Sequence, residues 1–364
     1  MISAGIANSN KKVMVAMSGG VDSSVAAYLL TKQGYEVSGV TMCLGIKTIS
    51  DSEPKCCGED SINDARDVCM KLGISHHVFD FSKDMKNKVI NKFISSYVNG
   101  KTPNPCIDCN RYLKFGLLLN KSISLGFDYL ATGHYAAIEN INGSYFLRKS
   151  ADKIKDQTYF LYPIKKESLP GIIFPLANYD KVQVREIAKK IDLPVAQKKE
   201  SQEVCFVDKK QYREFFKKNA NLKDIRPGNI LDINGKIIGK HEGIAFFTLG
   251  QRKGFGISAA NPLYVIKIDP QHSEITVGER KYLKSKKLIA GELNLFCEKL
   301  PERAKAKIRY NHKEADCTIL KTGSEFVITF DTEQEAITPG QSVVLYDNEI
   351  VLGGGVIREV LPDF

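Results

Sequence analysis

The chain has 364 residues, 43% of them hydrophobic, and this composition excludes wholesale disorder. Its 52 basic and 42 acidic side chains leave a net charge of +10, which suits a polyanionic partner but also an ordinary solvated surface. No stretch approaches the roughly 20 apolar residues of a membrane span, and the first dozen residues lack the apolar core of a secretion signal. We therefore expect a cytoplasmic protein of two or three domains that has no membrane partner.

The first half of the chain alternates predicted strands and helices. The strands are short apolar runs, and the helices carry apolar residues at every third or fourth position. Strands are predicted at 13–17, 37–42, 77–81 and 129–132, and helices at 23–33, 60–72 and 86–97. Strands separated by helices predict an α/β fold built on a doubly wound parallel sheet, which we assign to residues 1–208.

The pattern changes near residue 208. A short helix at 211–218 and glycine-rich, strand-like segments between 228 and 278 predict a small central domain, residues 209–284. Residues 285–364 alternate apolar and polar side chains between turn signals, which predicts a C-terminal antiparallel β-barrel. Its strands are predicted at 305–310, 317–320, 326–330, 343–346 and 350–352. Basic residues concentrate at 280–287 and 303–313, so this last domain is the candidate for contact with a polyanion.

A glycine-containing loop, Ser18-Gly19-Gly20-Val21-Asp22-Ser23, joins the first strand to the first helix. Glycines let successive backbone N–H groups approach an anion, and the following helix presents its positive N-terminus to the same charge. Asp22 suits a magnesium ion that bridges phosphates. The loop matches neither G-x-x-x-x-G-K-[ST] nor G-x-G-x-x-G. It resembles the loop of the ATP pyrophosphatase group, which adenylates a substrate oxygen and releases pyrophosphate; a simple corner with capping serines is the alternative.

Two segments carry cysteines that are candidates for chemistry. Cys106 and Cys109 lie in the segment 101–110, where two prolines disfavour helix, and we expect a rigid loop there. A Cys-x-x-Cys pair is typical of a redox pair, of half a metal site, or of a nucleophile with its neighbour. Cys205 follows Lys198-Lys199, which would favour a thiolate if the fold brings them close. The same Cys205 segment equally fits a packed strand.

Taken in chain order, these segments resemble the tRNA-specific 2-thiouridylases. The resemblance spans nearly the whole chain and includes four further motifs: Thr132-Gly133-His134-Tyr135, Lys155-Asp156-Gln157-Thr158-Tyr159-Phe160-Leu161, Thr248-Leu249-Gly250-Gln251-Arg252-Lys253-Gly254 and Thr338-Pro339-Gly340-Gln341-Ser342. It implies an enzyme that uses ATP and Mg²⁺ to thiolate the wobble uridine, position 34, of glutamate, glutamine and lysine tRNAs. It also implies two partners, a tRNA and a sulfur donor, the donor being a cysteine desulfurase, a sulfur-relay protein or sulfide.

The resemblance implies roles for individual residues as well. ATP would be bound by Ala16, Met17, Ser18, Gly19, Gly20, Val21, Asp22, Ser23, Met42 and Gly133. Cys205 would receive sulfane sulfur as a persulfide, and Cys109 would act as a nucleophile or resolve the persulfide as a disulfide. The tRNA, with its target base flipped out of the stack, would be contacted by Asn104, Pro105, Cys106, His134, Lys155, Asp156, Gln157, Arg309, Tyr310 and Gln341.

The chain departs from the family pattern at Cys106, where many relatives carry aspartate. Cys106, Cys109 and Cys205 would suffice to hold a [4Fe-4S] cluster with one open iron, and the cysteine count favours that cluster slightly over a persulfide relay. Two other functions remain open. One is that of another ATP pyrophosphatase, such as a 2-thiocytidine synthetase or an amidating ligase. The other is that of a nucleic-acid-binding module with a vestigial ATP site.

Overall fold

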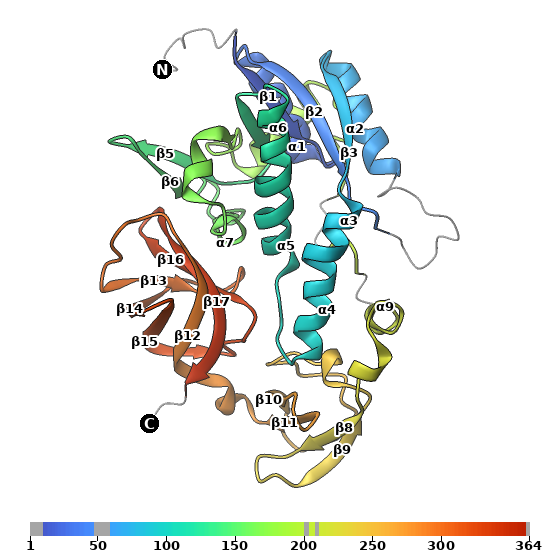
Figure 1. Ribbon diagram of the computed structural model, residues 1–364, viewed down its shortest axis with the longest axis vertical. Coiled ribbons are helices and arrows are strands. Elements are labelled where there is room, and N and C mark those ends of the chain that lie inside the picture. The colour runs from blue at the N-terminus through green and yellow to red at the C-terminus, as the bar shows by residue number, and fades with distance from the viewer. Residues whose placement is uncertain (1–9, 47–58, 200–203, 208–210, 362–364) are drawn as a thin grey trace. The chain divides into compact units, whose positions relative to one another are not determined.

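The computed structural model describes residues 10–46, 59–199, 204–207 and 211–361 (Figure 1). The chain divides into two compact units, and each draws on separated stretches of sequence. The first unit comprises residues up to Lys88, Cys106–Phe206 and Glu349–Val351. The second unit comprises Val89–Pro105, Val207–Asn348 and Leu352 onward. None of the described helices is long and apolar enough to cross a membrane.

The first unit is built on a five-stranded parallel sheet with the strand order β3-β2-β1-β4-β7. The strands are β1 (Lys12–Ala16), β2 (Glu36–Cys43), β3 (Ser75–Asp80), β4 (Tyr129–Thr132) and β7 (Ile172–Ile173). The central strand β1 pairs in parallel with both neighbours, so that Ala16 lies opposite Val40 and Thr132. Val13, Met14 and Val15 are completely buried, because helices cover both faces of the sheet. The doubly wound parallel sheet that the sequence predicts is confirmed.

Three helices of this unit pack on the sheet through apolar faces: α1 (Val21–Lys32), α2 (Glu59–Leu72) and α8 (Lys181–Lys190). Val13, Val15 and Met17 face a core that they share with these helices. Helix α8 begins with a capping box, in which the Asp180 side chain accepts from the Gln183 N–H and the Gln183 side chain accepts from the Asp180 N–H. The remaining elements of the first unit are α3 (Ser82–Asp84), a π-helical segment Met85–Ile90 that runs into the second unit, α6 (Leu119–Ser124), the hairpin β5 (Ala137–Ile141) and β6 (Ser144–Arg148), α7 (Thr158–Leu161) and a 3₁₀ segment Lys166–Gly171.

The predicted rigid loop over 101–110 is wrong in its second half. Helix α5 (Pro105–Asp108) begins there and continues directly into a π-helical segment, Cys109–Leu118. Proline is well tolerated at the first position of a helix, since its missing N–H has no intrahelical acceptor there and its φ is already helical. Pro105 therefore starts a helix, and Cys106 and Cys109 lie on consecutive positions of one helical face rather than in a loop.

The second unit contains a four-stranded sheet in the order β10-β11-β8-β9. Its strands are β8 (Gly228–Leu231), β9 (Ile237–His241), β10 (Tyr264–Asp269) and β11 (Glu274–Gly278). An aromatic cluster joins α4 (Asn91–Val98) to α9 (Tyr212–Asn219), with ring centroids 5.9 Å apart for Phe93 and Phe216 and 5.7 Å apart for Tyr97 and Tyr212. This packing explains why a segment from the first hundred residues belongs to the second unit. Short 3₁₀ segments complete it: Leu222–Asp224, Ile244–Phe246 and Arg280–Leu283.

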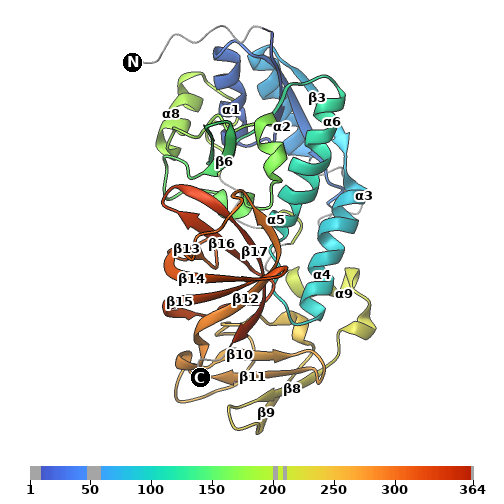
Figure 2. The ribbon, with the colours of Figure 1, turned by 60° about the vertical axis from the view of Figure 1, so that its left-hand side comes forward.

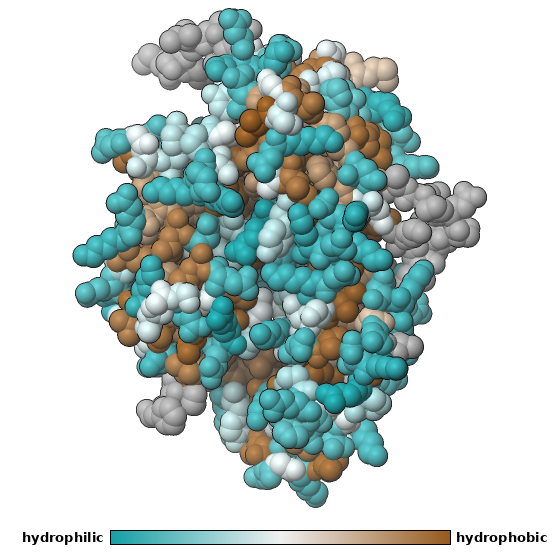
Figure 3. All heavy atoms as spheres, in the orientation of Figure 1, coloured by the Kyte–Doolittle hydropathy of each residue, from teal (hydrophilic) through white to brown (hydrophobic). Residues whose placement is uncertain are grey.

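The C-terminal part of the second unit is an antiparallel barrel, as the alternating pattern predicts, but it has six strands, because the first of them, β12, is not among the five predicted (Figure 2). The strand order is β12-β15-β14-β13-β16-β17, and pairing of β12 with β17 closes it. The strands are β12 (Lys284–Leu295), β13 (Arg303–Lys307), β14 (Ala315–Thr322), β15 (Glu325–Glu335), β16 (Ser342–Asp347) and β17 (Ile350–Leu361). Its interior is filled by fully buried side chains such as Leu288, Phe326 and Leu345. Hydrophilic side chains predominate on the face drawn in Figure 3, with hydrophobic areas scattered among them.

Gly340→Ala should destabilise the protein more than Gly323→Ala. Both glycines have positive φ, +93° and +60°, so alanine is strained at each position by about 1 kcal/mol. At Gly340 an added Cβ would also lie 2.9 Å from the backbone nitrogen of Thr102, whereas nothing lies within 4 Å at Gly323. Relieving that overlap should add roughly 1–3 kcal/mol to the loss in the free energy of unfolding. Urea denaturation followed by circular dichroism measures both losses, and equal losses would contradict the close approach.

Candidate active site

The predicted phosphate loop lies between the end of β1 and the start of α1. Gly19 has φ of +66° and is buried, and a Cβ there would lie 2.5 Å from the backbone oxygen of Ser61. Gly20 is the N-cap of α1, and no described side chain caps that helix start. The first backbone N–H groups of α1 are therefore not occupied by a capping side chain, which is the arrangement that an anion requires.

Serine hydroxyls brace this loop from inside. The Ser23 hydroxyl donates to the Gly20 carbonyl at 3.2 Å and accepts from the Ser18 N–H at 3.2 Å. The Ser24 hydroxyl donates to the same carbonyl at 2.8 Å. Ser18 is exposed, whereas Ser23 is buried. Ser18 is nevertheless joined to the buried serine, because its hydroxyl lies 3.3 Å from the Ser23 hydroxyl, and Ser23 stabilises the loop.

The other residues predicted to bind ATP gather around the loop. Ala16 ends β1, and the Met17 N–H continues the pairing by donating to the Val40 carbonyl at 2.7 Å. Met42 lies at the carboxyl end of the neighbouring strand β2. A Cβ on Gly133 would lie 2.6 Å from the backbone nitrogen of Ser23, so only glycine permits this approach. The structure therefore brings all these residues to the carboxyl ends of parallel strands, where α/β sheets bind ligands.

Asp22 has two partners that the sequence analysis missed. The Lys181 ammonium donates to both carboxylate oxygens, at 2.6 and 2.8 Å, and the Tyr135 hydroxyl donates to Oδ1 at 3.0 Å. No local pattern could have indicated Lys181, because 159 residues separate it from Asp22. Hard oxygen donors, the Asp22 carboxylate and the hydroxyl of Ser18, fit a magnesium ion. When bound, that ion would supply positive charge to the phosphates.

The three candidate cysteines lie in one neighbourhood of the first unit. Burial, with smaller contributions from Cys109 and Cys106, raises the pKa of the Cys205 thiol to about 12. Burial also raises the pKa of Cys106 and of Cys109. Cys106 and Cys205 retain exposed surface, so this burial reflects protein atoms crowded around the thiols rather than closure from solvent. All three are therefore thiols near neutral pH, close enough to influence one another's ionisation.

Lys114 is the cation that acts on these cysteines, and the sequence analysis missed it. Its ammonium opposes the rise in pKa at Cys106, at Cys109 and at Cys205. The i→i+5 bonding of the π-helical segment places Lys114 one turn after Cys109. The condition set for Lys198 and Lys199, that the fold brings them close enough to favour a Cys205 thiolate, is not met by Lys198. Lys198 instead donates to the Gly19 carbonyl at 3.0 Å and forms an ion pair with Asp64.

Cys106, Cys109 and Cys205 are the predicted ligands of an iron–sulfur cluster. Among the described residues, no group of three histidine, cysteine or acidic side chains is arranged to hold a metal ion. Cys106, Cys109 and Cys205 are near neighbours, since Cys106 and Cys109 both influence the ionisation of Cys205. The cluster stays a prediction.

His134 is held as a neutral imidazole. The Lys114 ammonium lies 3.4 Å from Nε2, and Thr132 Oγ1 lies 2.7 Å from Nδ1. An ammonium can only donate, so Nε2 accepts and Nδ1 carries the proton that bonds to Thr132. Burial, followed by the charge of Lys114, lowers the pKa of His134 well below its usual value. His134 is thus held in one tautomer next to Lys114, the lysine that also acts on the three cysteines.

The segment predicted to contact tRNA at 155–157 divides into two roles. Asp156 is buried, and its carboxylate accepts from the Ser150 N–H at 3.1 Å and from the Thr158 hydroxyl at 2.6 Å. Gln157 accepts from the Tyr135 N–H at 2.9 Å and thereby joins the segment to the residue after His134. The Asp156 side chain is committed to holding the backbone, whereas Lys155 and Gln157 are partly exposed.

In the second unit, Gln341 holds the segment that leads to Asn104 and Pro105. Its amide donates to the carbonyl of Thr102 at 2.8 Å, and the Thr102 N–H donates to the Pro339 carbonyl at 2.9 Å. The structure thus brings together residues that are 239 positions apart in the sequence. These bonds occupy the Gln341 amide group, so its first structural role is to position the proline segment.

The basic segments of the barrel are less available than the sequence indicated. Arg280 makes a two-pronged bond to Glu335, at 2.7 and 2.8 Å, and Lys284 lies 3.1 Å from Glu333. Arg309 donates to the carbonyl of Ala336 and to the Thr338 hydroxyl, and Tyr310 lies beneath the Lys307 ammonium. Much of the positive charge is therefore offset locally.

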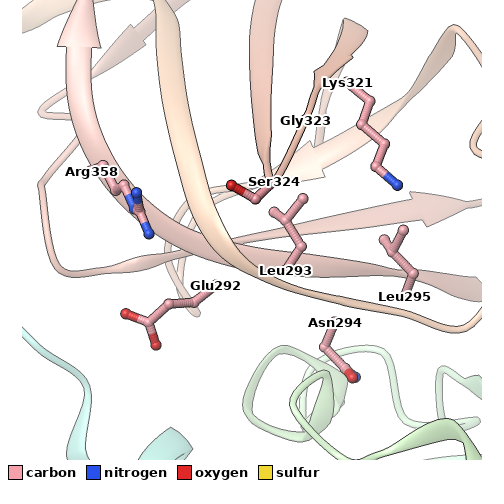
Figure 4. A pocket seen from close by; sticks show the side chains of 8 residues that line it. All are labelled: Glu292, Leu293, Asn294, Leu295, Lys321, Gly323, Ser324 and Arg358. Atoms are coloured by element: carbon pink, nitrogen blue, oxygen red, sulfur yellow. The ribbon is translucent and has the colours of Figure 1, made fainter.

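A hollow of about 570 Å³ on the barrel contains none of the predicted site residues (Figure 4). Its lining includes Glu292, Lys321 and Arg358, and the Arg358 guanidinium bonds to Glu325 at 2.8 Å. Cysteines and phosphate-binding glycines are absent from this lining. The hollow is therefore separate in composition from the chemistry of the first unit.

Comparison with known proteins assigns the family. Three family models match: a tRNA methyl transferase HUP domain at residues 11–209, a tRNA methyl transferase PRC-barrel domain at 213–279, and an aminomethyltransferase beta-barrel domain at 285–357. The tRNA-specific 2-thiouridylase MnmA 1 of Syntrophus aciditrophicus is 49% identical over 351 residues, covering 96% of this chain and 94% of that protein. The chain belongs to the tRNA-specific 2-thiouridylase family. The family's MnmA protein of Acetivibrio thermocellus is 49% identical over 360 residues, covering 96% of this chain and 100% of its own.

Membership of the tRNA-specific 2-thiouridylase family is consistent with the site geometry. The matching domain models carry descriptions that mention methyl transfer, whereas the full-length relatives are named for thiolation. The three thiols and the phosphate loop both lie in the first unit, within the range of the first domain model. This composition suits nucleotide activation coupled to sulfur chemistry.

His134 should remain neutral throughout the range from pH 8 to pH 6. Because burial and Lys114 lower its pKa, the folded chain takes up no proton there, whereas the unfolded chain does so near pH 6.5. Stability should therefore fall as pH drops below 6.5. Lys114→Met should raise the pKa of His134 by removing the neighbouring cation. Nitrogen-15 NMR of the imidazole follows the protonation of His134 in the unaltered protein and in Lys114→Met. A protonated ring at pH 6 in the unaltered protein would refute the prediction.

Cys205 should react slowly with iodoacetamide at pH 8, given its pKa of about 12. Its small thiolate population, partly offset by the greater nucleophilicity of a high-pKa thiolate, should make alkylation about 100-fold slower than that of a free cysteine. The rate should then climb about tenfold per pH unit up to pH 10. Mass spectrometry of the Cys205 peptide gives the rate, with the urea-unfolded chain as the control. A rate that levels off near pH 7 would show a thiolate instead.

Proposed function

We propose that the protein catalyses ATP-dependent 2-thiolation of the wobble uridine, position 34, of lysine, glutamate and glutamine tRNAs. One observation carries the proposal. A phosphate loop and three mutually interacting thiols, Cys106, Cys109 and Cys205, occur in the same compact unit. ATP activation alone would need only the loop, and thiol redox chemistry alone would need only the cysteines. The full-length relatives, which are named tRNA-specific 2-thiouridylases, support thiolation of tRNA.

Activation comes first in the proposed reaction. The uracil O2 attacks the α-phosphorus of ATP, the bond to the β-phosphate oxygen breaks, and pyrophosphate leaves. Glycine backbone N–H groups at the start of α1 and a magnesium ion at Asp22 would hold the phosphates. The uracil C2 then carries AMP as a leaving group, which turns an unreactive amide-like carbonyl into an electrophile.

Sulfur transfer follows through Cys205 and Cys109. A donor of sulfane sulfur first converts Cys205 to a persulfide, whose terminal sulfur attacks C2 and expels AMP. Cys109 then loses its proton to solvent, and its thiolate attacks the Cys205 sulfur, which releases 2-thiouridine and leaves a Cys109–Cys205 disulfide. Two electrons from an external thiol reductant restore both cysteines. The proximity of the two thiols and the Lys114 charge beside them support this route.

Substrate contacts are proposed from the positions of the remaining residues. His134, Lys155 and Gln157 would contact the tRNA from the first unit, and Asn104, Pro105, Arg309 and Tyr310 from the second. We propose that Asp156 and Gln341 support these contacts through the backbone segments that they hold. The domain division 1–208, 209–284 and 285–364 and a cytoplasmic location, where the tRNA substrates are made, belong to the same proposal. The donor would be a cysteine desulfurase or a sulfur-relay protein.

Cys205→Ser and Cys109→Ser should each lower thiolation by at least roughly 1,000-fold, because each removes a reacting sulfur. The protein is incubated with ATP, Mg²⁺, a sulfur donor, reductant and unmodified tRNA, and nucleosides are analysed by mass spectrometry. Cys297→Ser, a barrel cysteine, is the matched control and should stay active. In the relay, Cys106→Ser should retain activity. Loss of activity together with loss of bound iron in Cys106→Ser would favour the cluster.

The same assay separates the competing functions. Formation of AMP and pyrophosphate in step with 2-thiouridine at position 34 supports the proposal. ATP-dependent modification of cytidine, methylation of tRNA, or tRNA binding without ATP cleavage would each defeat it.

A further inference from the structure

The ion pair between Lys181 and Asp22 is the feature of the phosphate site that its proposed chemistry leaves unexplained. Lys181 Nζ lies 2.6 and 2.8 Å from the two carboxylate oxygens of Asp22, and Tyr135 adds a third donor. The Lys181 side chain is only 11% exposed, against 33% for Asp22. Three donors thus occupy most of the lone pairs of this carboxylate, and the Lys181 ammonium lies where a magnesium ion bound to both oxygens would have to be.

The position of Lys181 is fixed by the start of α8. The capping box of Asp180 and Gln183 defines the first turn, and the Lys181 N–H donates to Asp152 Oδ2 at 3.0 Å. The backbone thus directs a long, flexible side chain toward the phosphate loop. An ammonium on four methylene groups can change partners by rotation of its own bonds, with no movement of the helix.

Charge makes such an exchange favourable when a triphosphate arrives. A largely buried ammonium needs an anionic partner at all times, since an unpaired one would cost several kcal/mol. In the absence of nucleotide that partner is Asp22. A triphosphate placed on the N–H groups at the start of α1 would bring several further negative oxygens to the same place, and an unrelieved Asp22 carboxylate would repel it.

We propose that Lys181 is a phosphate-binding residue for ATP. Without nucleotide its ammonium is paired with the carboxylate of Asp22. When MgATP binds, the ammonium moves to a phosphate oxygen, and the Asp22 carboxylate turns to the magnesium ion. This inference rests on the proposed use of ATP. The exchange alters only hydrogen bonds and ionic contacts. It explains how a small loop that contains no lysine binds both a magnesium ion and the triphosphate.

Nucleotide binding without tRNA tests the proposal. Isothermal titration calorimetry gives the Kd of ATP, with and without Mg²⁺, and the Kd of adenosine. Lys181→Met should weaken ATP binding about tenfold or more, the value of one charge-assisted hydrogen bond. It should leave adenosine binding unchanged, because adenosine has no phosphate. Lys190→Met removes an exposed lysine from the last turn of the same helix and should bind ATP normally.

A second pair of variants controls for misfolding of Lys181→Met. Lys181→Met alone leaves Asp22 without its cation, so Asp22→Asn and the double variant Asp22→Asn/Lys181→Met are compared as a cycle. Asp22→Asn should bind Mg²⁺-free ATP at least as tightly as the unaltered protein, while Mg²⁺ should no longer strengthen binding. Adding Lys181→Met to it should again cost about tenfold in ATP affinity.

The outcomes separate the two levels of inference. Equal ATP affinity of Asp22→Asn and the double variant would overturn the role of Lys181, which would then only neutralise Asp22. An unaltered protein that binds no ATP would overturn the proposed function together with this inference. A loss of ATP affinity confined to the lysine variants, with adenosine unaffected, would support it.

Discussion

The carboxylate of Asp22 lies in the first turn of α1, at the end of the helix that attracts anions, so a phosphate group that binds there would meet the repulsion of this carboxylate. Lys181 and Tyr135 offset that repulsion with three hydrogen bonds to one side chain. Each partner comes from a different part of the sheet's surroundings: Tyr135 from the connection after β4, and Lys181 from the start of α8. The close approach of Gly133 to Ser23 keeps these connections against the loop. A single charged group thus couples the central strand, its neighbour and a covering helix.

The sulfur chemistry of the same unit depends on a second balance, between burial and one lysine. Crowding by protein atoms raises the pKa of Cys106, Cys109 and Cys205, and Lys114 opposes that rise at each of them. Thiols kept protonated are protected from random oxidation, since the thiolate is the reactive form. Lys114 also fixes the tautomer of His134. Burial therefore keeps these thiols protonated, and one ammonium partly offsets that effect in a cluster that has no carboxylate at position 106.

The second unit contributes position rather than reactive groups. The aromatic cluster of α4 and α9 binds the segment 89–105 to this unit, and Gln341 and Gly340 hold Thr102 just before the proline segment. Cys106 follows Pro105 directly. The chain is therefore held by the barrel just before α5 begins, and α5 itself leads into the cysteines that belong to the first unit. Ion pairs such as Arg280–Glu335 reduce the barrel's free positive charge.

The sequence by itself determined the elements, the parallel sheet, the barrel and the phosphate loop. Strand burial, helical periodicity and glycine spacing are local properties that short stretches of chain carry. Only the tertiary structure decided which groups act on one another. No local pattern indicated that Lys181 binds Asp22, that Lys114 acts on the cysteines, or that Lys198 binds the Gly19 carbonyl. The proline-based prediction of a loop failed because a helix begins at Pro105. The reason is physical: hydrogen bonds and charges act over a few ångströms in space, whereas these partners are brought together only when distant strands and helices pack.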